Sequence, residues 1–326
     1  MKLPRRTFLQ FAGATAATPA FSRIATAQTY PARPITMIVP YPPGGPTDVL
    51  ARVLAEQMRS SLGQPMIIEN VGGAEGSIGV TRAARARSDG YTIDLGAKST
   101  HVLNSAFYSL PYDVLNDFVP ISPLVTSPTI LLATKTIPPK DLNELIVWLK
   151  ANPNKVSAGF GAVAYRLLAV SFQKETATQF TLVPYRGGAP ALQDLVAGQI
   201  ELLFSTPDAL PLVRAGSIKA YAVANDTRMV LAPDVPTFAE MGFPALSFST
   251  WWALFAPKGT PKEPIDRLNA AAVQALADPI TRSRLADLGS EVFPREQQTP
   301  EALGAFQRAQ IEKWWPLIKE LGIKAE

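Results

Sequence analysis

The chain has 326 residues, of which 47% are hydrophobic, so we expect a folded protein with more than one core rather than a disordered chain. It has no cysteine and a single histidine, which argues against disulfides, a thiolate nucleophile, an iron–sulfur site and a zinc or non-haem iron site. The formal net charge is +4.

The first 27 residues have the pattern of an export signal. A basic start with Arg5 and Arg6 precedes an uncharged stretch, 7–22, and the small residues that follow predict cleavage after Ala27. The Arg5-Arg6 pair favours twin-arginine export, with ordinary secretion as the alternative. We therefore expect a periplasmic protein.

Removal of this signal changes the charge balance. Residues 1–27 hold four of the 31 basic residues and no acidic one, so the mature chain has 27 residues of each sign. A neutral chain lacks the electrostatic footprint of a nucleic-acid or membrane-surface binder. The longest uncharged stretch, 118–134, contains three prolines and is expected to form strand-sized pieces rather than a membrane span.

Strand-like and helix-like patterns alternate along the mature chain, with proline and glycine at their boundaries. The expected strands are 35–39, 66–69, 91–95, 122–137, 156–160, 181–184, 200–204, 219–224 and 246–255. The expected helices are 47–58, 80–87, 141–150, 164–176, 190–197, 262–277, 279–288 and 300–321. Residues 72–79 and 97–101 are expected to be loops.

This alternation predicts an α/β protein with two lobes, each a mostly parallel sheet flanked by helices. Lobe one is expected to comprise 28–124 plus 250–326, and lobe two 125–249. The chain would then cross between the lobes twice, near 125 and near 249. Two crossing segments form a hinge, with a ligand cleft between the lobes.

Two glycine loops, one in each expected lobe, carry the same pattern. VPYPPGGPTDVL (39–50) and VPYRGGAPALQDL (183–195) both run from a strand through Val-Pro-Tyr and two glycines into a helix. If both face the cleft, two helix N-termini offer free backbone N–H groups and partial positive charge to one ligand. Such a site favours a small carboxylated anion and needs no basic side chain.

A nucleotide site fits these loops less well. The first loop has no lysine after its glycines, and Asp48 beside it would repel a phosphate. Plain turn chemistry before a helix is the alternative for either loop alone.

Motifs across almost all of the mature chain resemble the substrate-binding receptors of tripartite tricarboxylate transporters, the Bug-type receptors. The resemblance is carried by PITMIVPYPPGGPTDVLARVLAEQM, GQPMIIENVGGAEGSIG, DGYTIDLG, LPYDVLNDFVPIS, PDVPTFAEMG and LFAPKGTP. It implies a two-lobe periplasmic binding protein of the Venus-flytrap type. Such a receptor, expected to be a monomer, captures a small carboxylated solute by hinge closure and delivers it to a membrane permease.

The resemblance also implies which positions bind the ligand. Carried over residue by residue, they are Tyr41, Pro43, Gly44, Gly45, Thr47, Asp48, Ser99, Thr100, His101, Ala162, Val163, Ala164, Tyr165, Tyr185, Arg186 and Gly187, with Ser205 where many relatives have aspartate. No catalytic and no metal-binding residue is implied.

Departures from the family pattern bear on the ligand. The stretch Ala162-Val163-Ala164-Tyr165 replaces small hydroxyl residues, so we hypothesise a less polar lobe two that suits a longer or aromatic acid. Glu75, in the glycine-rich loop 72–79, could instead select an amine-bearing ligand. Arg186 could clamp a carboxylate with its planar guanidinium or be an exposed loop charge.

Three further residues have competing interpretations. His101 follows Ser99-Thr100, but catalysis would also need an orienting acid and an oxyanion hole, so we expect it to hydrogen-bond ligand or backbone. Of Trp251 and Trp252, one is expected to pack at the hinge and the other to be partly exposed or to face the cleft. An exported hydrolase and a ligand sensor for a membrane kinase remain alternative functions.

Overall fold

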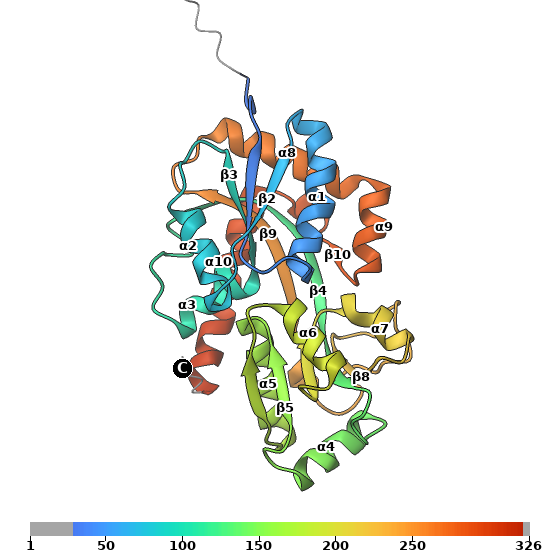
Figure 1. The fold of residues 1–326 in the computed structure, drawn as a ribbon. Helices are drawn as coiled ribbons and strands as arrows, with labels where there is room; N and C mark the ends of the chain where they lie inside the picture. Colours follow the sequence, from blue (N-terminus) through green and yellow to red (C-terminus); the bar gives the residue numbers. More distant parts are fainter. Residues whose placement is uncertain (1–28, 322–326) are drawn as a thin grey trace, which may run out of the picture.

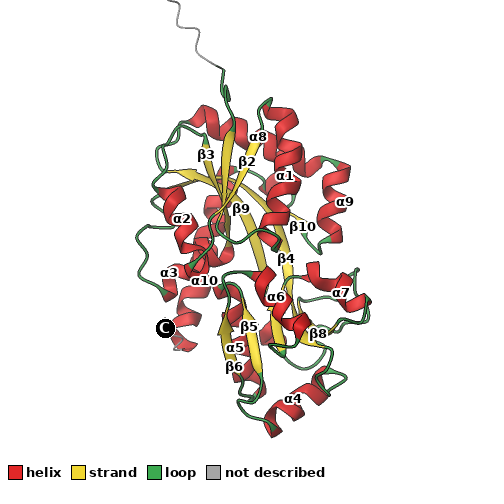
Figure 2. Ribbon diagram, in the orientation of Figure 1, coloured by secondary structure: helices red, strands yellow, loops and turns green. Residues whose placement is uncertain are grey.

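The computed structural model describes residues 29–321, so the export signal predicted for residues 1–27 lies outside the described residues. The chain forms two lobes, which Figures 1 and 2 show one above the other. The two-lobe α/β fold expected from the sequence is confirmed. Two long strands, β4 (Phe118–Thr134) and β9 (Ser249–Pro257), connect the lobes.

Lobe one is built around the first three strands and the C-terminal helices. Its strands are β1 (Ile35–Val39), β2 (Met66–Asn70), β3 (Thr92–Ala97) and β10 (Glu291–Val292). Its helices are α1 (Pro46–Leu62), α2 (Ser77–Ala84), α3 (Asn104–Phe107), α8 (Lys262–Ala277), α9 (Pro279–Asp287) and α10 (Pro300–Leu321). A π-helical turn, η2 (Ser99–Leu103), lies where the sequence indicated a loop.

Lobe two contains the middle of the chain. Its strands are β5 (Ser157–Phe160), β6 (Thr181–Pro184), β7 (Leu202–Ser205) and β8 (Ile218–Ala224). Its helices are α4 (Leu142–Ala151), α5 (Val163–Thr176), α6 (Gly188–Ala197) and α7 (Leu210–Arg214). The short 3-10 turns η1 (Ala74–Gly76), η3 (Pro207–Ala209), η4 (Pro244–Leu246) and η5 (Arg295–Gln297) complete the described elements.

The crossing strands join two partly parallel sheets. The strand order is β2-β1-β3-β9-β4-β7-β5-β6, with β8 and β10 also paired to β4. The pairs within β1–β3 and within β5–β7 are parallel, as expected from the alternating pattern. The pairs made by β4 and β9 are antiparallel, because these strands carry the chain out of lobe one and back.

The proline-rich stretch 118–134 is one continuous strand rather than separate pieces. Its pairing with β9 shifts register between Pro120 and Ser122 and again between Pro123 and Val125. Proline has no N–H to donate to a neighbouring strand, and a local bulge accommodates that gap without ending the strand. The lobe boundaries proposed at 124/125 and 249/250 fall inside β4 and β9 and stay a prediction.

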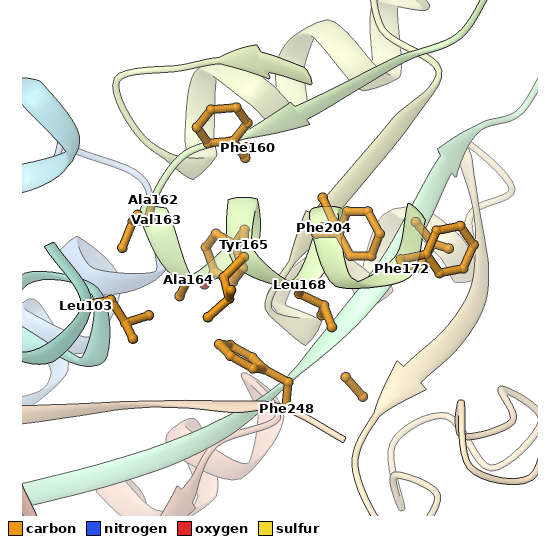
Figure 3. Packing of buried hydrophobic residues seen from close by; sticks show 14 of the residues in the cluster. Leu103, Phe160, Ala162, Val163, Ala164, Tyr165, Leu168, Phe172, Phe204 and Phe248 are labelled. Carbon is orange, nitrogen blue, oxygen red and sulfur yellow. The ribbon is translucent and has the colours of Figure 1, made fainter. Parts of the chain in front are cut away.

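One large apolar cluster extends across both lobes. It contains Ile38 and Leu103 from lobe one, Phe160 and Tyr165 from lobe two, and Phe248 from the segment that enters β9. Figure 3 shows Leu103, Tyr165 and Phe248 around the start of α5. Since residues of both lobes are buried against one another, the structure is a closed form.

No helix within residues 29–321 is both long and apolar enough to cross a membrane.

Candidate functional site

A small, partly open cavity of about 30 Å³ lies at the seam between the lobes. Side chains from lobe one, lobe two and the crossing strand β9 all contribute to its wall. The lining residues are Tyr41, Pro42, Gly45, Pro46, Thr47, Ala97, Ser99, Gly161, Ala162, Tyr165, Gly188, Thr250 and Trp252. None of these lining residues carries a charged side chain.

Lobe one supplies hydroxyl groups to this cavity. The Tyr41 hydroxyl is buried and makes no hydrogen bond of ordinary geometry within residues 29–321, although the nearby Ser99 hydroxyl acts to lower its pKa. Burial raises the pKa of Tyr41 well above its usual value, so the hydroxyl keeps its proton and remains a donor. Thr47 Oγ1 accepts a hydrogen bond from Trp252 Nε1 at 2.9 Å, which leaves its own hydrogen available.

Ser99 connects the two lobes across the cavity. Its Oγ accepts a hydrogen bond from the backbone N–H of Ala164 at 3.2 Å. Ala164 lies in the first turn of α5, so a hydroxyl of lobe one satisfies a backbone donor of lobe two. The contact requires the lobes to be closed, and the Ser99 hydroxyl hydrogen can still point toward a ligand.

Three helices begin at the cavity wall. Their N-cap residues are Gly45 for α1, Ala162 for α5 and Gly187 for α6. At none of the three does an N-cap side chain accept a hydrogen bond from the first turn of the helix. The positive ends of three helix dipoles therefore lie beside a cavity that already contains hydroxyl donors, although the N–H of Ala164 in α5 is occupied by Ser99 and Pro46 in α1 has no N–H. A carboxylate suits this environment, because donors surround it and no acidic side chain lines the wall.

The loop before α1 is held by Asp48, which is buried behind the cavity. Its carboxylate accepts hydrogen bonds from Gly44 N at 2.9 Å, Asn70 Nδ2 at 3.0 Å and the Arg52 guanidinium at 2.9 Å. Burial alone would raise the pKa of Asp48, but the bonds from Arg52, Gly44 and Asn70 outweigh it and lower that pKa. Asp48 therefore shapes the loop without lining the cavity.

Known proteins resemble the chain in sequence and in fold. Residues 50–323 match the tripartite tricarboxylate transporter family receptor. The chain belongs to this receptor family. The chain is similar to BugT of Bordetella pertussis, with 37% identity over 94% of this chain and 95% of BugT. Solved periplasmic binding proteins share the two-lobe fold.

Two solved relatives of the receptor hold organic acids. MatC from Rhodopseudomonas palustris, with bound malate, is 36% identical over 89% of this chain and all of that chain, with a TM-score of 0.85. A second R. palustris protein, Rpa4515 with adipate, is 31% identical over 91% of this chain and all of that chain, with a TM-score of 0.86.

The receptor places only part of the carried-over set at the cavity. The members that line it are Tyr41, Gly45, Thr47, Ser99, Ala162 and Tyr165. Val163 and Ala164 are buried directly behind this wall in α5, and Gly187 packs against Pro42 across the seam. Pro43 and Gly44 are exposed at the loop tip, and Ser205 is buried away from the lining. The part that each plays in binding stays a prediction.

Tyr185 and Arg186 lie instead at a separate groove of about 630 Å³ between the lobes. Glu75 lines the same groove, and its Oε1 accepts a hydrogen bond from the Tyr108 hydroxyl at 3.1 Å. Burial raises the pKa of Glu75, although Tyr108 and Arg166 act in the opposite direction. Arg186 is exposed. Neither Glu75 nor Arg186 lines the cavity at the seam.

Several lining residues were absent from the carried-over set. Trp252 is the clearest, since its indole closes one side of the cavity and bonds to Thr47. The expectation that one of Trp251 and Trp252 is partly exposed was wrong, because they are only 2% and 4% exposed. The alternation along 246–255 indicated that one tryptophan could face the cleft, but could not select Trp252.

His101 and Thr100 lie in the core of lobe one rather than at the cavity. The imidazole is fully buried, stacks on Phe255 with ring centroids 4.0 Å apart and has Thr100 Oγ1 3.1 Å from its Nδ1. Asp94 Oδ2 lies 3.4 Å from Nε2. This string of hydroxyl, imidazole and carboxyl has the order of a catalytic triad, but all three side chains are enclosed, so a substrate has no access to them.

The charge state of His101 can be measured directly, because it is the only histidine in the sequence. Burial lowers the pKa of His101 to about 3, so the imidazole is neutral in the folded receptor, and burial raises the pKa of Asp94. We expect the imidazole NMR signals of untagged protein to show no titration between about pH 5 and 8. A midpoint near the ordinary value of about 6.5 would contradict this placement.

The lowered pKa of His101 also predicts how the stability of the fold changes in acid. The unfolded chain binds a proton at His101 more readily than the folded chain does. The stability that neutral His101 contributes is therefore complete above about pH 6.5 and is lost as the pH falls toward 3.

Within residues 29–321, no group of three His, Cys, Asp or Glu side chains is arranged to hold a metal ion.

Proposed function

We propose that the receptor captures a small organic acid in the cavity at the seam by closure of its lobes, in the periplasm, and that the closed form delivers the acid to a tripartite tricarboxylate-type permease. The observation that carries the proposal is the buried Tyr41 hydroxyl, which makes no hydrogen bond of ordinary geometry within residues 29–321, in a cavity of hydroxyl groups and helix N-termini. An unsatisfied buried donor is costly, and a ligand oxygen removes that cost.

The relatives that hold malate and adipate support a carboxylate as the ligand class. The size of the cavity supports one carboxylate group of an acid. About 30 Å³ has room for a group the size of one or two water molecules, such as one carboxylate. A whole acid, whether malate, adipate or an aromatic acid, would need the lobes to close less far. We favour aliphatic acids because the two relatives hold malate and adipate, and the aromatic preference suggested by Ala162 and Tyr165 becomes an outcome of the test.

The test is a thermal-shift and calorimetric screen of residues 28–326 with malate, adipate, benzoate and arginine. An acid present at a hundred times its dissociation constant adds about 2.7 kcal/mol of stability, which gives a clear rise in melting temperature. Recovery of the acid unchanged would also separate binding from turnover. The proposal fails if none of the acids raises the melting temperature.

The variant Tyr41→Phe tests whether the acid binds in this cavity. Loss of a hydrogen bond to a charged group costs about 1.5–3 kcal/mol, so the affinity should fall roughly tenfold to a hundredfold. Tyr108→Phe is the matched control, because it removes a hydroxyl from the outer groove instead. An unchanged affinity in Tyr41→Phe, together with a loss in Tyr108→Phe, would move the site to the groove.

A further inference from the structure

Lys98 is a buried lysine at the point where the hinge meets the ligand cavity. It follows β3 and directly precedes Ser99, the residue that bonds across the seam to Ala164. Its side chain is only 2% exposed. Among the residues that the structure describes, it is one of the largest side chains buried to this degree.

The amino group of Lys98 lies in a small cage with two aromatic walls. Nζ is 3.6 Å from the ring centroid of Phe248 and 3.8 Å from that of Trp314. It also donates a hydrogen bond to the carbonyl oxygen of Ser249 at 2.9 Å. These partners within residues 29–321 include no carboxylate. Burial and the nearby Lys313 lower the pKa of Lys98 well below its usual value, so the charged form costs free energy that an apolar side chain of similar length would avoid.

The three partners come from different parts of the hinge. Ser249 is the first residue of the crossing strand β9, and Phe248 N donates to the carbonyl of Ala224 at the end of β8 in lobe two. Trp314 is in α10, which moves with lobe one because Trp315 Nε1 donates to the carbonyl of Val102 in η2. Lys98 therefore bridges a fixed element of lobe one and the start of the crossing strand.

Because Ser99 directly follows Lys98 in the chain, the position of Lys98 affects where Ser99 lies at the cavity. Ser99 is the next residue, and both the cavity lining and the bond to Ala164 depend on where Ser99 lies. A shift of Ser249 relative to Lys98 would change the angle of lobe two and, with it, the distance from Ser99 to Ala164. Neither Lys98 nor Phe248 is among the lining residues.

We propose that Lys98 is a positioning residue for ligand binding, whose caged amino group sets the closed angle of the hinge and thereby aligns Ser99 with the first turn of α5. The inference rests on the proposed closure around an acid. It explains why a polar amino group is retained in an aromatic, enclosed position where packing alone would favour methionine.

The experiment compares Lys98→Met with Lys313→Met. The second lysine is a matched control, because it lies over the same Trp314 ring at 5.2 Å but is exposed on α10. Since the chain has no cysteine, spin labels can be attached at Val147→Cys in α4 and Ile280→Cys in α9, which are 68% and 59% exposed. The distance between these labels reports how far the lobes close.

We expect Lys98→Met to broaden the distance distribution without ligand and to weaken malate or adipate binding about tenfold, because it removes the hydrogen bond to Ser249 and the contacts of Nζ with both rings. Lys313→Met removes a charge that lowers the pKa of Lys98, so it should neither broaden the distances nor weaken binding. A purely structural role would lower the melting temperature equally with and without acid and leave the distances unchanged. Unchanged distances and affinity in Lys98→Met would overturn the inference.

Two further measurements distinguish a variant that does not fold, or a failure of the proposed function, from a failure of the inference about Lys98. If Lys98→Met does not fold, Phe248→Leu keeps the amino group and removes one wall of the cage, and it should also broaden the distances; an unchanged distribution overturns the inference. If the unmodified receptor binds neither malate nor adipate, the proposed function fails, whereas the ligand-free distances still decide the role of Lys98.

Discussion

Replacement of Gly187 by alanine is expected to leave both lobes folded but to lower the affinity for malate or adipate at least about tenfold. A Cβ at this position would lie 2.8 Å from Cδ of Pro42, on the opposite side of the seam. Gly187 has an extended backbone with φ of 165°, which alanine adopts without strain. The added methyl group therefore acts as a wedge between the lobes.

Pro42 cannot move away from the added methyl group, because it is also in contact with the chain on its other side. A Cβ built at Gly72 would lie 3.0 Å from the same Cδ atom, so the ring of Pro42 is in close contact with both the loop 72–79 and the loop before α6. The lobes must open by a fraction of an ångström or more to relieve the contact. That movement would also lengthen the hydrogen bond from Ala164 N to Ser99 Oγ, which is 3.2 Å in the closed form.

Isothermal calorimetry measures the affinity, and circular dichroism checks that the variant is folded. Gly304→Ala is the matched control, because a Cβ there meets its nearest atoms at 3.6 Å, an ordinary contact, on α10. It should bind the acid as tightly as the unmodified receptor. If Gly187→Ala binds equally tightly, the contact with Pro42 does not limit closure.

The second large effect concerns Asp208, where replacement by asparagine is expected to stabilise the receptor at pH 7 but not at pH 4. Asp208 lies in η3 and lines a small interlobe cavity together with Pro46 and Trp252. Burial raises the pKa of Asp208 from 3.8 to about 6, although Thr206 Oγ1 donates a hydrogen bond to its Oδ1 at 2.7 Å. The charged form is thus disfavoured in the closed receptor.

The sign of the pH dependence follows from this raised pKa. Below pH 3.8 the carboxyl is protonated in folded and unfolded chains alike and costs nothing. As the pH rises through 6, the folded chain has to bury the carboxylate, and stability is lost. Asparagine keeps the acceptor for Thr206 and removes the charge, so the gain at pH 7 should be on the order of 2 kcal/mol.

Urea unfolding at pH 4 and pH 7 measures this gain. The control is Asp266→Asn, because Asp266 is exposed on α8 and makes a surface ion pair with Lys262 at 2.6 Å. That substitution should change stability by less than about 1 kcal/mol at either pH. An equal gain for Asp208→Asn at both pH values would mean that packing, rather than charge, accounts for it.

The sequence alone predicted most regular elements, because their signals are local. The strands at 35–39 and 181–184 and the helices at 262–277 and 300–321 have the bounds expected from their apolar patterns and from flanking proline and glycine. The turn at 99–103 was not predicted. Its helical form depends on distant partners, such as Gln307 Nε2, which donates to the carbonyl of His101 at 2.9 Å.

The site was predictable as a set of loops but not as a set of side chains. Glycine pairs before helices located the loops correctly along the chain, since backbone conformation depends largely on the local sequence. Whether a side chain faces the cavity depends on packing between elements. His101 turns toward Phe255 in the core, whereas Trp252 turns toward Thr47 at the cavity, and neither direction follows from a local pattern.

The strand β4 pairs with β9 and β10 in lobe one and with β7 and β8 in lobe two. One uninterrupted strand is therefore the centre of both sheets, and an apolar cluster continues across the seam beside it. Neither lobe is complete without a stretch of chain that the other also requires. We therefore expect the two lobes to unfold together in one cooperative transition.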